Sequence, residues 1–315
     1  MPSGSERRFA VGVNGGGTRT QFVLIDNELA ILARLTSSST NFRNIGFEAA
    51  YHAVNAGINQ VIAQAGLFTA QIAGIGLGLA GSGNVAAQRL FQQALENAFP
   101  GTVISFDNDA VAALVGGAGR AVGIIAVSGT GSIVVGVDER GARARAGGWG
   151  YHLDRGSGYA IGRGALAAIA LAQDGLGPDT ALTERILKRL GLSEPRDLVE
   201  WLYALDRRTE DIAALAEEAV ELAGGDPVAA ELIRNAAESL ADSVRVVGKR
   251  LDFAEQAFPL LTSGSLFEHS ALLRDLFLAA VRSVMPDIVV TTALYDAAVG
   301  AAIMAFQKLG LVLPQ

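Results

Sequence analysis

The order of hydrophobic and polar positions along the first third of the chain predicts an α/β protein. Apolar runs rich in β-formers at both sides of a glycine-rich turn indicate an antiparallel pair of strands. A longer segment with apolar side chains four positions apart, Ala50 to Ile62, indicates one buried face of a helix. The pattern predicts strands at 9–13, 21–26, 31–35, 72–79 and 102–106, and helices at 46–65 and 85–98.

The opening pattern of this first segment recurs once, beginning near residue 123. Apolar strands expected at 123–127 and 133–138 again enclose a turn of glycines and hydroxyl residues, Ser128–Ser132. In both copies the second strand ends on an aspartate, Asp26 or Asp138. A weak internal repeat of this kind predicts two domains of similar fold.

The remainder of the chain is predicted to be largely helical. The pattern places helices at 160–173, 183–190, 195–205, 209–223, 228–251, 272–283 and 296–309, with strands at 259–262 and 287–290. No Pro- or Ser-rich linker separates the two halves. We therefore expect an N-terminal domain at 1–115, completed by the C-terminal helix 298–315, and a second domain at 116–297 with helical additions.

Composition narrows the range of functions. The 315 residues are 50% hydrophobic and 18% charged, which excludes a disordered chain. Glycine accounts for 38 of them, a larger share than the usual ~7%. The absence of cysteine excludes disulfides, thiolate zinc sites and iron–sulfur clusters. A net charge of −7 gives no support for nucleic-acid or membrane partners, and no apolar run approaches a membrane span. A cytoplasmic protein is expected.

The two glycine turns are the first candidates for ligand binding. One or two glycines suffice for a tight hairpin, whereas each turn here combines several glycines with hydroxyl residues. Consecutive small residues let backbone N–H groups converge on an anion, and hydroxyls add donors. The occurrence of two such turns predicts phosphate binding by Gly15, Gly16, Gly17 and Thr18 in the first turn, and by Gly129, Thr130 and Gly131 in the second.

A third glycine pattern, Gly76-Leu-Gly78-Leu-Ala-Gly81, matches a dinucleotide-binding signature and follows a predicted strand. It lies far from the N-terminus, however, behind a hairpin sheet with which a Rossmann half does not begin. The match therefore gives little support for NAD binding. No Walker-type phosphate loop is present.

Two further segments are candidates for catalysis or ligand binding, although a structural role can also be given for the first. Asp107-Asn108-Asp109 ends a strand and begins a helix, so these residues could cap the helix or supply a general base and a metal-binding carboxylate. The glycine-rich loop 147–158 contains Trp149 and Asp154. Aromatic faces stack on sugar rings and carboxylates accept hydroxyl hydrogen bonds, so this loop favours a sugar ligand.

Taken together, these motifs resemble the N-acetylglucosamine kinase and BadF/BcrA ATPase-like family, over almost the whole chain. The resemblance adds Ser39-Thr40-Asn41 as a sugar-contacting stretch and 262–266 as an adenosine-binding turn. It implies two ribonuclease H-like, actin-like ATPase domains with a nucleotide and sugar cleft between them, and ATP-dependent phosphorylation of an amino sugar. The implied roles are Asp109 as catalytic base, Asn41, Asp109, Gly148, Trp149 and Asp154 at the sugar, Gly264 and Ser265 at adenosine, and Asn14 and Asp107 near Mg²⁺.

The chain also departs from this family's pattern. Asn14 stands where relatives usually have Asp or Glu, Arg155 replaces Glu or Gln, and Phe42-Arg43 differ from the residues common beside Asn41. The acceptor expected first is N-acetylglucosamine or glucosamine, at the 6-hydroxyl. N-acetylmuramic acid, another sugar, or a nucleotide-binding regulator with little turnover are the alternatives. Relatives that activate dehydratases through an iron–sulfur cluster are excluded by the missing cysteines, and the resemblance suggests a homodimer.

Overall fold

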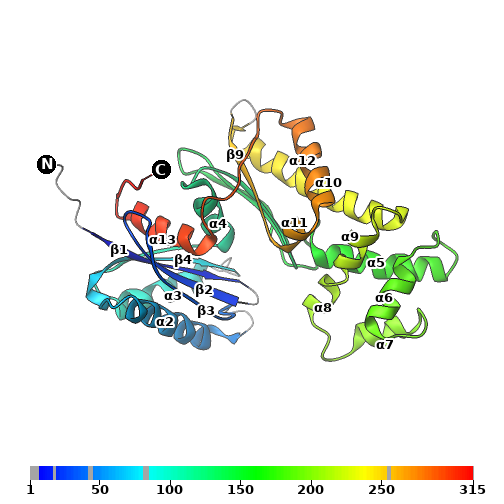
Figure 1. The fold of residues 1–315 in the computed structure, drawn as a ribbon, viewed down its shortest axis with the longest axis horizontal. Coiled ribbons are helices and arrows are strands. Elements are labelled where there is room, and N and C mark those ends of the chain that lie inside the picture. The colour runs from blue at the N-terminus through cyan, green and yellow to red at the C-terminus, as the bar shows by residue number, and fades with distance from the viewer. Residues whose placement is uncertain (1–6, 17–18, 42–44, 81–84, 254–256, 315) are drawn as a thin grey trace. The chain divides into compact units, whose positions relative to one another are not determined.

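The computed structural model describes residues 7–16, 19–41, 45–80, 85–253 and 257–314. The chain divides into two compact units, which we describe separately (Figure 1). The first comprises 1–123, 137–141 and 290–315, and the second comprises 124–136 and 142–289. Within the described residues, no helix combines the length and the apolar character needed to cross a membrane.

The first unit contains a mixed five-stranded sheet in the order β3-β2-β1-β4-β5. Its strands are β1 (Phe9–Gly15), β2 (Arg19–Asp26), β3 (Ile31–Ser38), β4 (Ile72–Leu79) and β5 (Val103–Asp107). The first three pair antiparallel in sequence order, and β4 and β5 then run parallel to β1. The hairpin, the third strand and the two later strands that the sequence predicts are confirmed.

Helices cover both faces of this sheet, α2 and α3 on one side and α13 on the other (Figure 1). The helices of this unit are α2 (Phe47–Gln64), the short 3₁₀ helix η1 (Thr69–Gln71), α3 (Val85–Ala98), α4 (Asp109–Ala118) and α13 (Ala297–Lys308). Side chains alternate along a strand, so Val11 and Val13 of β1 point into the apolar core against α2 and α3. Gly12 and Asn14 belong to the opposite face.

That opposite face is lined with glycines because α13 lies very close to the sheet. A Cβ at Gly76 would lie 1.7 Å from the carbonyl oxygen of Ala301, and one at Gly12 would lie 1.9 Å from that of Ala298. Any side chain would therefore push the helix away from the strands. Close helix packing accounts for Gly76 without a bound dinucleotide.

The second unit has a sheet in the order β10-β9-β6-β7-β8, which reproduces the order of the first sheet. Its strands are β6 (Gly123–Ser128), β7 (Ser132–Val137), β8 (Arg143–Gly147), β9 (Pro259–Ser263) and β10 (Val289–Val290). Three sequential strands followed by two later ones occur in both sheets, so the predicted repeat is confirmed. The hydrophobic pattern did not predict β8, an edge strand in which Arg143 and Arg145 make that pattern weak.

The repeated aspartates have a structural role at the far end of each hairpin. Asp26 Oδ1 accepts the backbone N–H groups of Glu28 at 3.0 Å and Ala30 at 2.9 Å. Asp138 Oδ1 accepts the N–H of Arg140 at 2.9 Å in the same manner. Each carboxylate therefore closes the turn that follows its strand, which is a common role for aspartate.

Helices form the larger part of the second unit. They are α5 (Gly158–Gln173), α6 (Leu182–Leu190), α7 (Asp197–Tyr203), α8 (Thr209–Ala213), α9 (Ala216–Leu222), α10 (Pro227–Arg250), α11 (Ser265–His269) and α12 (Ala271–Val284). The helix predicted at 209–223 is divided into α8 and α9, and the short α11 was not anticipated. Their apolar faces and one face of the sheet form a single buried core.

Asp226 joins the start of α6 to the start of α10, and its removal should destabilise the second unit. Its Oδ1 caps α10 by accepting the N–H of Ala229 at 2.9 Å, while Oδ2 accepts Thr180 Oγ1 at 2.8 Å and the N–H of Ala181 at 2.6 Å. Burial alone would raise the pKa of Asp226, but these donors hold it below the ordinary value. We expect Asp226→Ala to lower the free energy of unfolding by about 2–4 kcal/mol at pH 7.

The pH dependence of this loss provides the check. A lowered folded-state pKa means that the stabilisation is present above the unfolded-state pKa of about 3.9, and is lost as the pH falls through the folded-state value. Denaturant unfolding should thus show the largest difference between parent and variant at neutral pH, and a diminishing one below pH ~4. Glu238→Ala, on an exposed position of α10, is the control and should change little. Equal effects of the two substitutions would contradict this role for Asp226.

Candidate functional site

The first glycine turn belongs to a row of polar residues across the first sheet. The strand register pairs Asn14 of β1 with Gly78 of β4, and Gly78 with Asp107 of β5. Paired residues of parallel strands point to the same face, so the side chains of Asn14 and Asp107 flank Gly78. A Cβ at Gly78 would lie 2.4 Å from Ala112 Cβ and 3.4 Å from Asp109 Cα. The glycine thus lets the first turn of α4 approach this row.

Asp109 is the first residue of α4, and Asn108 caps the helix by accepting the N–H of Val111 at 2.8 Å. Asp109 Oδ1 accepts the N–H of Ala110 at 3.1 Å. Burial raises the pKa of the Asp109 carboxyl above its ordinary value, although this backbone contact opposes the rise. A desolvated carboxylate at the end of a strand is suited to accepting a proton.

Asn14 and Asp107 were assigned to the metal, and their environment fits an oxygen-binding cation. Asn14 Oδ1 is buried and has no hydrogen-bond partner among the described residues, which is costly for a polar atom unless a ligand satisfies it. Asp107 is only 7% exposed. Within the same residues, no group of three His, Asp or Glu side chains forms a metal cage. The arrangement fits Mg²⁺ held by one or two protein oxygens together with phosphate and water.

The other residues assigned to this unit lie next to the row. Gly15 and Gly16 form the described part of the first turn, whereas Gly17 and Thr18 lie outside the described residues, as do Phe42 and Arg43. Asn41 follows β3, and its backbone N–H donates to Ser39 Oγ at 3.2 Å. The first sheet therefore brings together the described part of the predicted phosphate turn and the residues predicted to contact the sugar, to hold the metal and to act as the base.

In the second unit, hydrogen bonds hold the glycine turn between β6 and β7 to the residues that precede and begin α5. Ser128 Oγ donates to the Gly156 carbonyl at 2.7 Å, and Ser132 Oγ donates to the Arg155 carbonyl at 2.5 Å. The N–H of Gly158 donates to the carbonyl of Gly129 at 2.7 Å. These bonds hold the turn against the start of α5, where its backbone N–H groups can contribute to an anion site.

The predicted adenosine turn packs directly on this glycine turn. Gly264 has φ of +101°, and a Cβ there would lie 2.3 Å from the Ser128 carbonyl oxygen. Only glycine allows this approach. A cavity of about 470 Å³ opens beside the two turns; it is lined by Gly129, Thr130, Gly158, Glu210, Ala213, Ala214, Ala216, Glu217, Val220, Glu221, Ser265, Leu266, His269 and Ser270. Gly129, Thr130 and Ser265 thus face one cavity.

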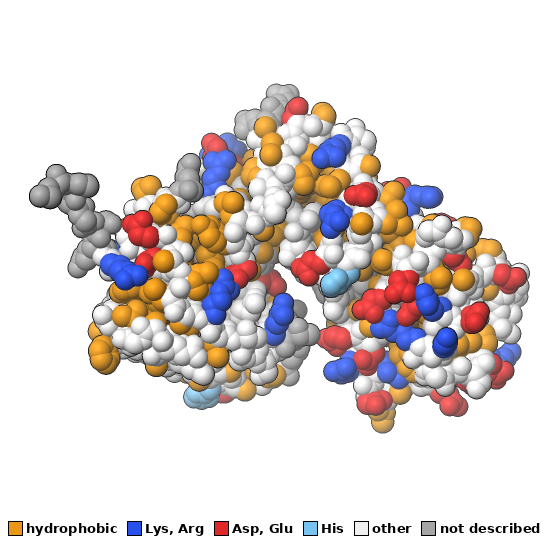
Figure 2. Space-filling model, in the orientation of Figure 1, with side chains coloured by type: hydrophobic (Ala, Val, Ile, Leu, Met, Phe, Trp, Pro, Cys, Tyr) orange, Lys and Arg blue, Asp and Glu red, His pale blue; other side chains and the backbone are white. Residues whose placement is uncertain are grey.

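The helices that form the opposite wall of this cavity were predicted as core, with no chemical role. Alanines and glutamates of α8 and α9 line it, among them Ala213, Ala216, Glu217 and Glu221. Arg185 and Arg189 of α6 hold α9 in place: both pair with the buried Glu218, at 3.0 and 2.8 Å. Glu217 and Glu221 extend this network. Figure 2 shows acidic and basic side chains interspersed over the helical part of the second unit.

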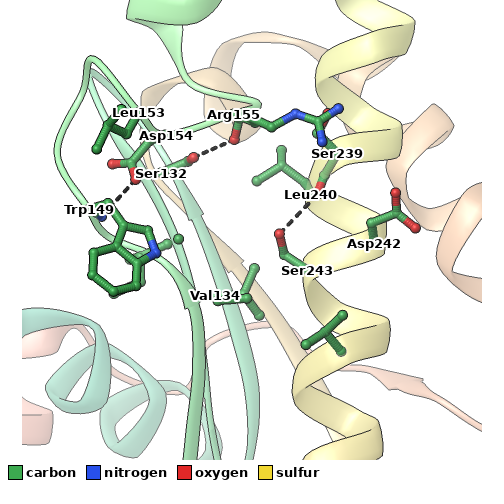
Figure 3. A pocket seen from close by; sticks show the side chains of 14 residues that line it. Ser132, Val134, Trp149, Leu153, Asp154, Arg155, Ser239, Leu240, Asp242 and Ser243 are labelled. Atoms are coloured by element: carbon green, nitrogen blue, oxygen red, sulfur yellow. Dashed lines mark hydrogen bonds between the residues drawn. The ribbon is translucent and has the colours of Figure 1, made fainter.

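The predicted sugar loop is held by its aspartate. Asp154 Oδ1 accepts the N–H of Trp149 at 2.8 Å, and a Cβ at Gly131 would lie 3.3 Å from Asp154 Oδ2 (Figure 3). Burial raises the pKa of the Asp154 carboxyl, against the opposing effect of nearby backbone amides. The indole of Trp149 is 70% exposed, and the Arg145 guanidinium lies 4.8 Å from its ring centroid. An exposed indole ring beside the second glycine turn remains accessible for a sugar ring.

A cavity of about 230 Å³ lies between this loop and α10 (Figure 3). Gly147, Trp149, Asp154 and Arg155 line it, together with Ser239, Asp242 and Ser243 of α10, which the sequence analysis did not select. Gly148 lies next to this cavity and has a φ of +70°. A Cβ at Gly148 would lie 2.6 Å from Cδ1 of Ile133, which lines the cavity. The second unit therefore brings together Gly148, Trp149 and Asp154, next to Gly131 of the second glycine turn.

The chain is similar to a known family and to several named proteins. Over residues 11–305 the chain matches the model of the BadF/BadG/BcrA/BcrD ATPase family. It is 32% identical to N-acetyl-D-glucosamine kinase of Dictyostelium discoideum, over 96% of this chain and 99% of the relative. It is 29% identical to N-acetylmuramic acid/N-acetylglucosamine kinase of Clostridium acetobutylicum, over 95% and 98%.

The solved structure of a candidate N-acetylglucosamine kinase from Chromobacterium violaceum is also similar. It superposes with a TM-score of 0.75 at 29% identity, covering 94% of this chain and 98% of that one. The predicted actin-like α/β fold is thereby confirmed. Because the family model spans almost the whole chain, the protein belongs to the BadF/BadG/BcrA/BcrD ATPase family.

Proposed function

We propose that this protein is an ATP-dependent kinase that phosphorylates an amino sugar, N-acetylglucosamine or glucosamine, at the 6-hydroxyl. The observation that carries the proposal is the environment of Gly78. There a desolvated carboxylate, Asp109, begins a helix beside Asp107 and the Asn14 amide oxygen, which has no hydrogen-bond partner among the described residues. Phosphoryl transfer to a hydroxyl uses a base that accepts the hydroxyl proton and a cation held by oxygen ligands, and these residues fit both roles.

In this proposal the residues of the chain bind, orient and accept a proton. Asp109 takes the proton of the attacking hydroxyl, and backbone N–H groups of the two glycine turns hold the phosphates. Asn41, Gly148, Trp149 and Asp154 orient the sugar, while Gly264 and Ser265 lie against adenosine. Asn14 and Asp107 would hold Mg²⁺, which supplies charge neutralisation for the transferred phosphoryl group when bound. The two units of the chain serve as the two domains of the enzyme.

The decisive experiment is an ADP-release assay over a panel of sugars. N-acetylglucosamine, glucosamine, N-acetylmuramic acid and glucose should be supplied with ATP and Mg²⁺, and the phosphorylated position of any product assigned by phosphorus–proton NMR. We expect an amino sugar to stimulate ADP release most strongly and to be phosphorylated at O6. If no sugar stimulates ADP release, the kinase proposal fails, and a nucleotide-binding regulator becomes the better description.

The acceptor has one supported alternative. The Clostridium acetobutylicum relative is named for N-acetylmuramic acid as well as N-acetylglucosamine, so the same panel includes that sugar. The homodimer, the cytoplasmic location and the lack of nucleic-acid and membrane partners expected from the sequence stay predictions.

Asn14→Asp tests the proposed cation site. Without metal, the new carboxylate would lie on the same face as Asp107, so repulsion and burial should lower the melting temperature. Added Mg²⁺ should restore it, and the Mg²⁺ concentration for half-maximal activity should fall about three- to tenfold, because each added ligand charge strengthens binding of a hard cation. Asn14→Ala is the control and should lack the Mg²⁺-dependent gain. No change in Mg²⁺ dependence with Asn14→Asp would argue against metal binding here.

A further inference from the structure

A single hydroxyl links the first glycine turn to the asparagine assigned to the sugar. Ser39 Oγ donates a hydrogen bond to the carbonyl oxygen of Gly16 at 2.9 Å. The same hydroxyl oxygen accepts the backbone N–H of Asn41 at 3.2 Å. The turn assigned to phosphate and the residue assigned to the sugar are therefore two hydrogen bonds apart.

A buried pair of threonines reinforces this link. Thr20, which follows the turn, is fully buried, and Thr40 is 1% exposed. The N–H of Thr40 donates to Thr20 Oγ1 at 3.0 Å, and the two hydroxyl oxygens lie 2.8 Å apart. A Cβ at Gly15 would lie 2.8 Å from Thr40 Oγ1, so the Thr40 side chain packs against the backbone of the turn. A shift of either segment must move the other.

We propose that Ser39 is a positioning residue that couples nucleotide binding at the first turn to sugar binding at Asn41. The inference rests on the proposed function. In this scheme each substrate orders the segment that it contacts, and segments joined by hydrogen bonds are ordered together. The second substrate then binds to a segment that is already ordered, so each substrate raises the affinity for the other without a direct contact between them. Ser39 itself touches neither reacting atom in this scheme.

The test compares sugar affinity with and without nucleotide. Isothermal titration of N-acetylglucosamine into the full-length protein, alone and saturated with the ATP analogue AMPPNP and Mg²⁺, gives two dissociation constants whose ratio measures the coupling. We expect AMPPNP to tighten sugar binding at least about fivefold in the parent, at the low end of typical allosteric couplings. In Ser39→Ala the ratio should fall below about two, while binding of each ligand alone changes less. Ser39→Thr keeps the hydroxyl and should restore the ratio.

Ser37→Ala is the matched control, because Ser37 Oγ donates to the adjacent Ser38 carbonyl, at 3.2 Å, and not to the turn. It should keep the parental ratio, and melting curves should show all variants folded. A ratio near one in the parent, or an unchanged ratio in Ser39→Ala, would overturn the coupling while leaving the kinase proposal intact. A parent protein that binds neither the sugar nor AMPPNP would overturn the proposed function and this inference with it.

Discussion

Asp109→Asn should lower kcat by about 10²- to 10⁴-fold, the usual contribution of a general base. The amide keeps the size of the carboxylate and can still orient a hydroxyl, but it cannot accept the proton. KM for ATP should change little, because Asp109 is assigned to the acceptor. Steady-state kinetics with the best sugar of the panel provide the measurement. Retention of more than about a fifth of the parental kcat would show that Asp109 is not the base.

The same substitution should raise stability in metal-free buffer at about pH 7.5. Burial raises the folded-state pKa of Asp109, so the parent loses stability as the pH rises through that pKa, when a charge must be buried. Asparagine carries no charge and avoids this loss, so its advantage should disappear at pH values low enough to protonate Asp109 in both states. Asp275→Asn, at an exposed position of α12, is the matched control for both measurements. A lower melting temperature for Asp109→Asn would contradict the desolvation argument.

Gly76→Ala should lower the free energy of unfolding by about 3 kcal/mol or more, at the upper end of overpacking effects. The added Cβ would meet the carbonyl oxygen of Ala301 at 1.7 Å and its carbonyl carbon at 2.5 Å. Both are backbone atoms of α13, so no side-chain rotation can relieve the contact. For a unit of this size, each kcal/mol of lost stability lowers the melting temperature by about 2–4 °C. The melting temperature of Gly76→Ala should therefore fall by about 6 °C or more.

Gly224→Ala is the control, because a Cβ there meets nothing within 4 Å. It should leave the melting temperature nearly unchanged. The comparison also decides between the two explanations of the Gly76–Gly81 pattern. A phosphate-binding glycine would tolerate alanine in thermal unfolding and show its effect only on ligand binding, whereas a packing glycine shows it without any ligand.

Much of the fold was predictable because local patterns specify it. Hydrophobic periodicity placed β4 at 72–79 and α3 at 85–98, and the repeated hairpin predicted two similar units. The strand β8 was missed, because alternation of Arg143, Ala144 and Arg145 at a sheet edge gives little apolar signal. The helix 209–223 was not expected to break into α8 and α9, since its composition is helical throughout.

The candidate site was predictable as a set of residues but not as an arrangement. The turns, the strand-ending acids and the Trp149 loop stand out because their residue types are unusual for simple hairpins and caps. The helix faces that line both cavities of the second unit, such as Ala213 and Ser239, look like ordinary core. Nothing in their local sequence distinguishes a wall that faces a cavity from one that faces another helix.

The sequence alone determined the order of most strands and helices, the doubled glycine turns and the identity of the chemical groups, because each depends on neighbours within a few residues. Only the tertiary structure decided that Asn14, Gly78 and Asp107 share one row, that Gly76 serves helix packing, and that Ser39 joins the turn to Asn41. Most of these relations follow from strand register and helix approach, which bring together residues far apart in the chain. They are set by the packing of the whole unit, which no local pattern encodes.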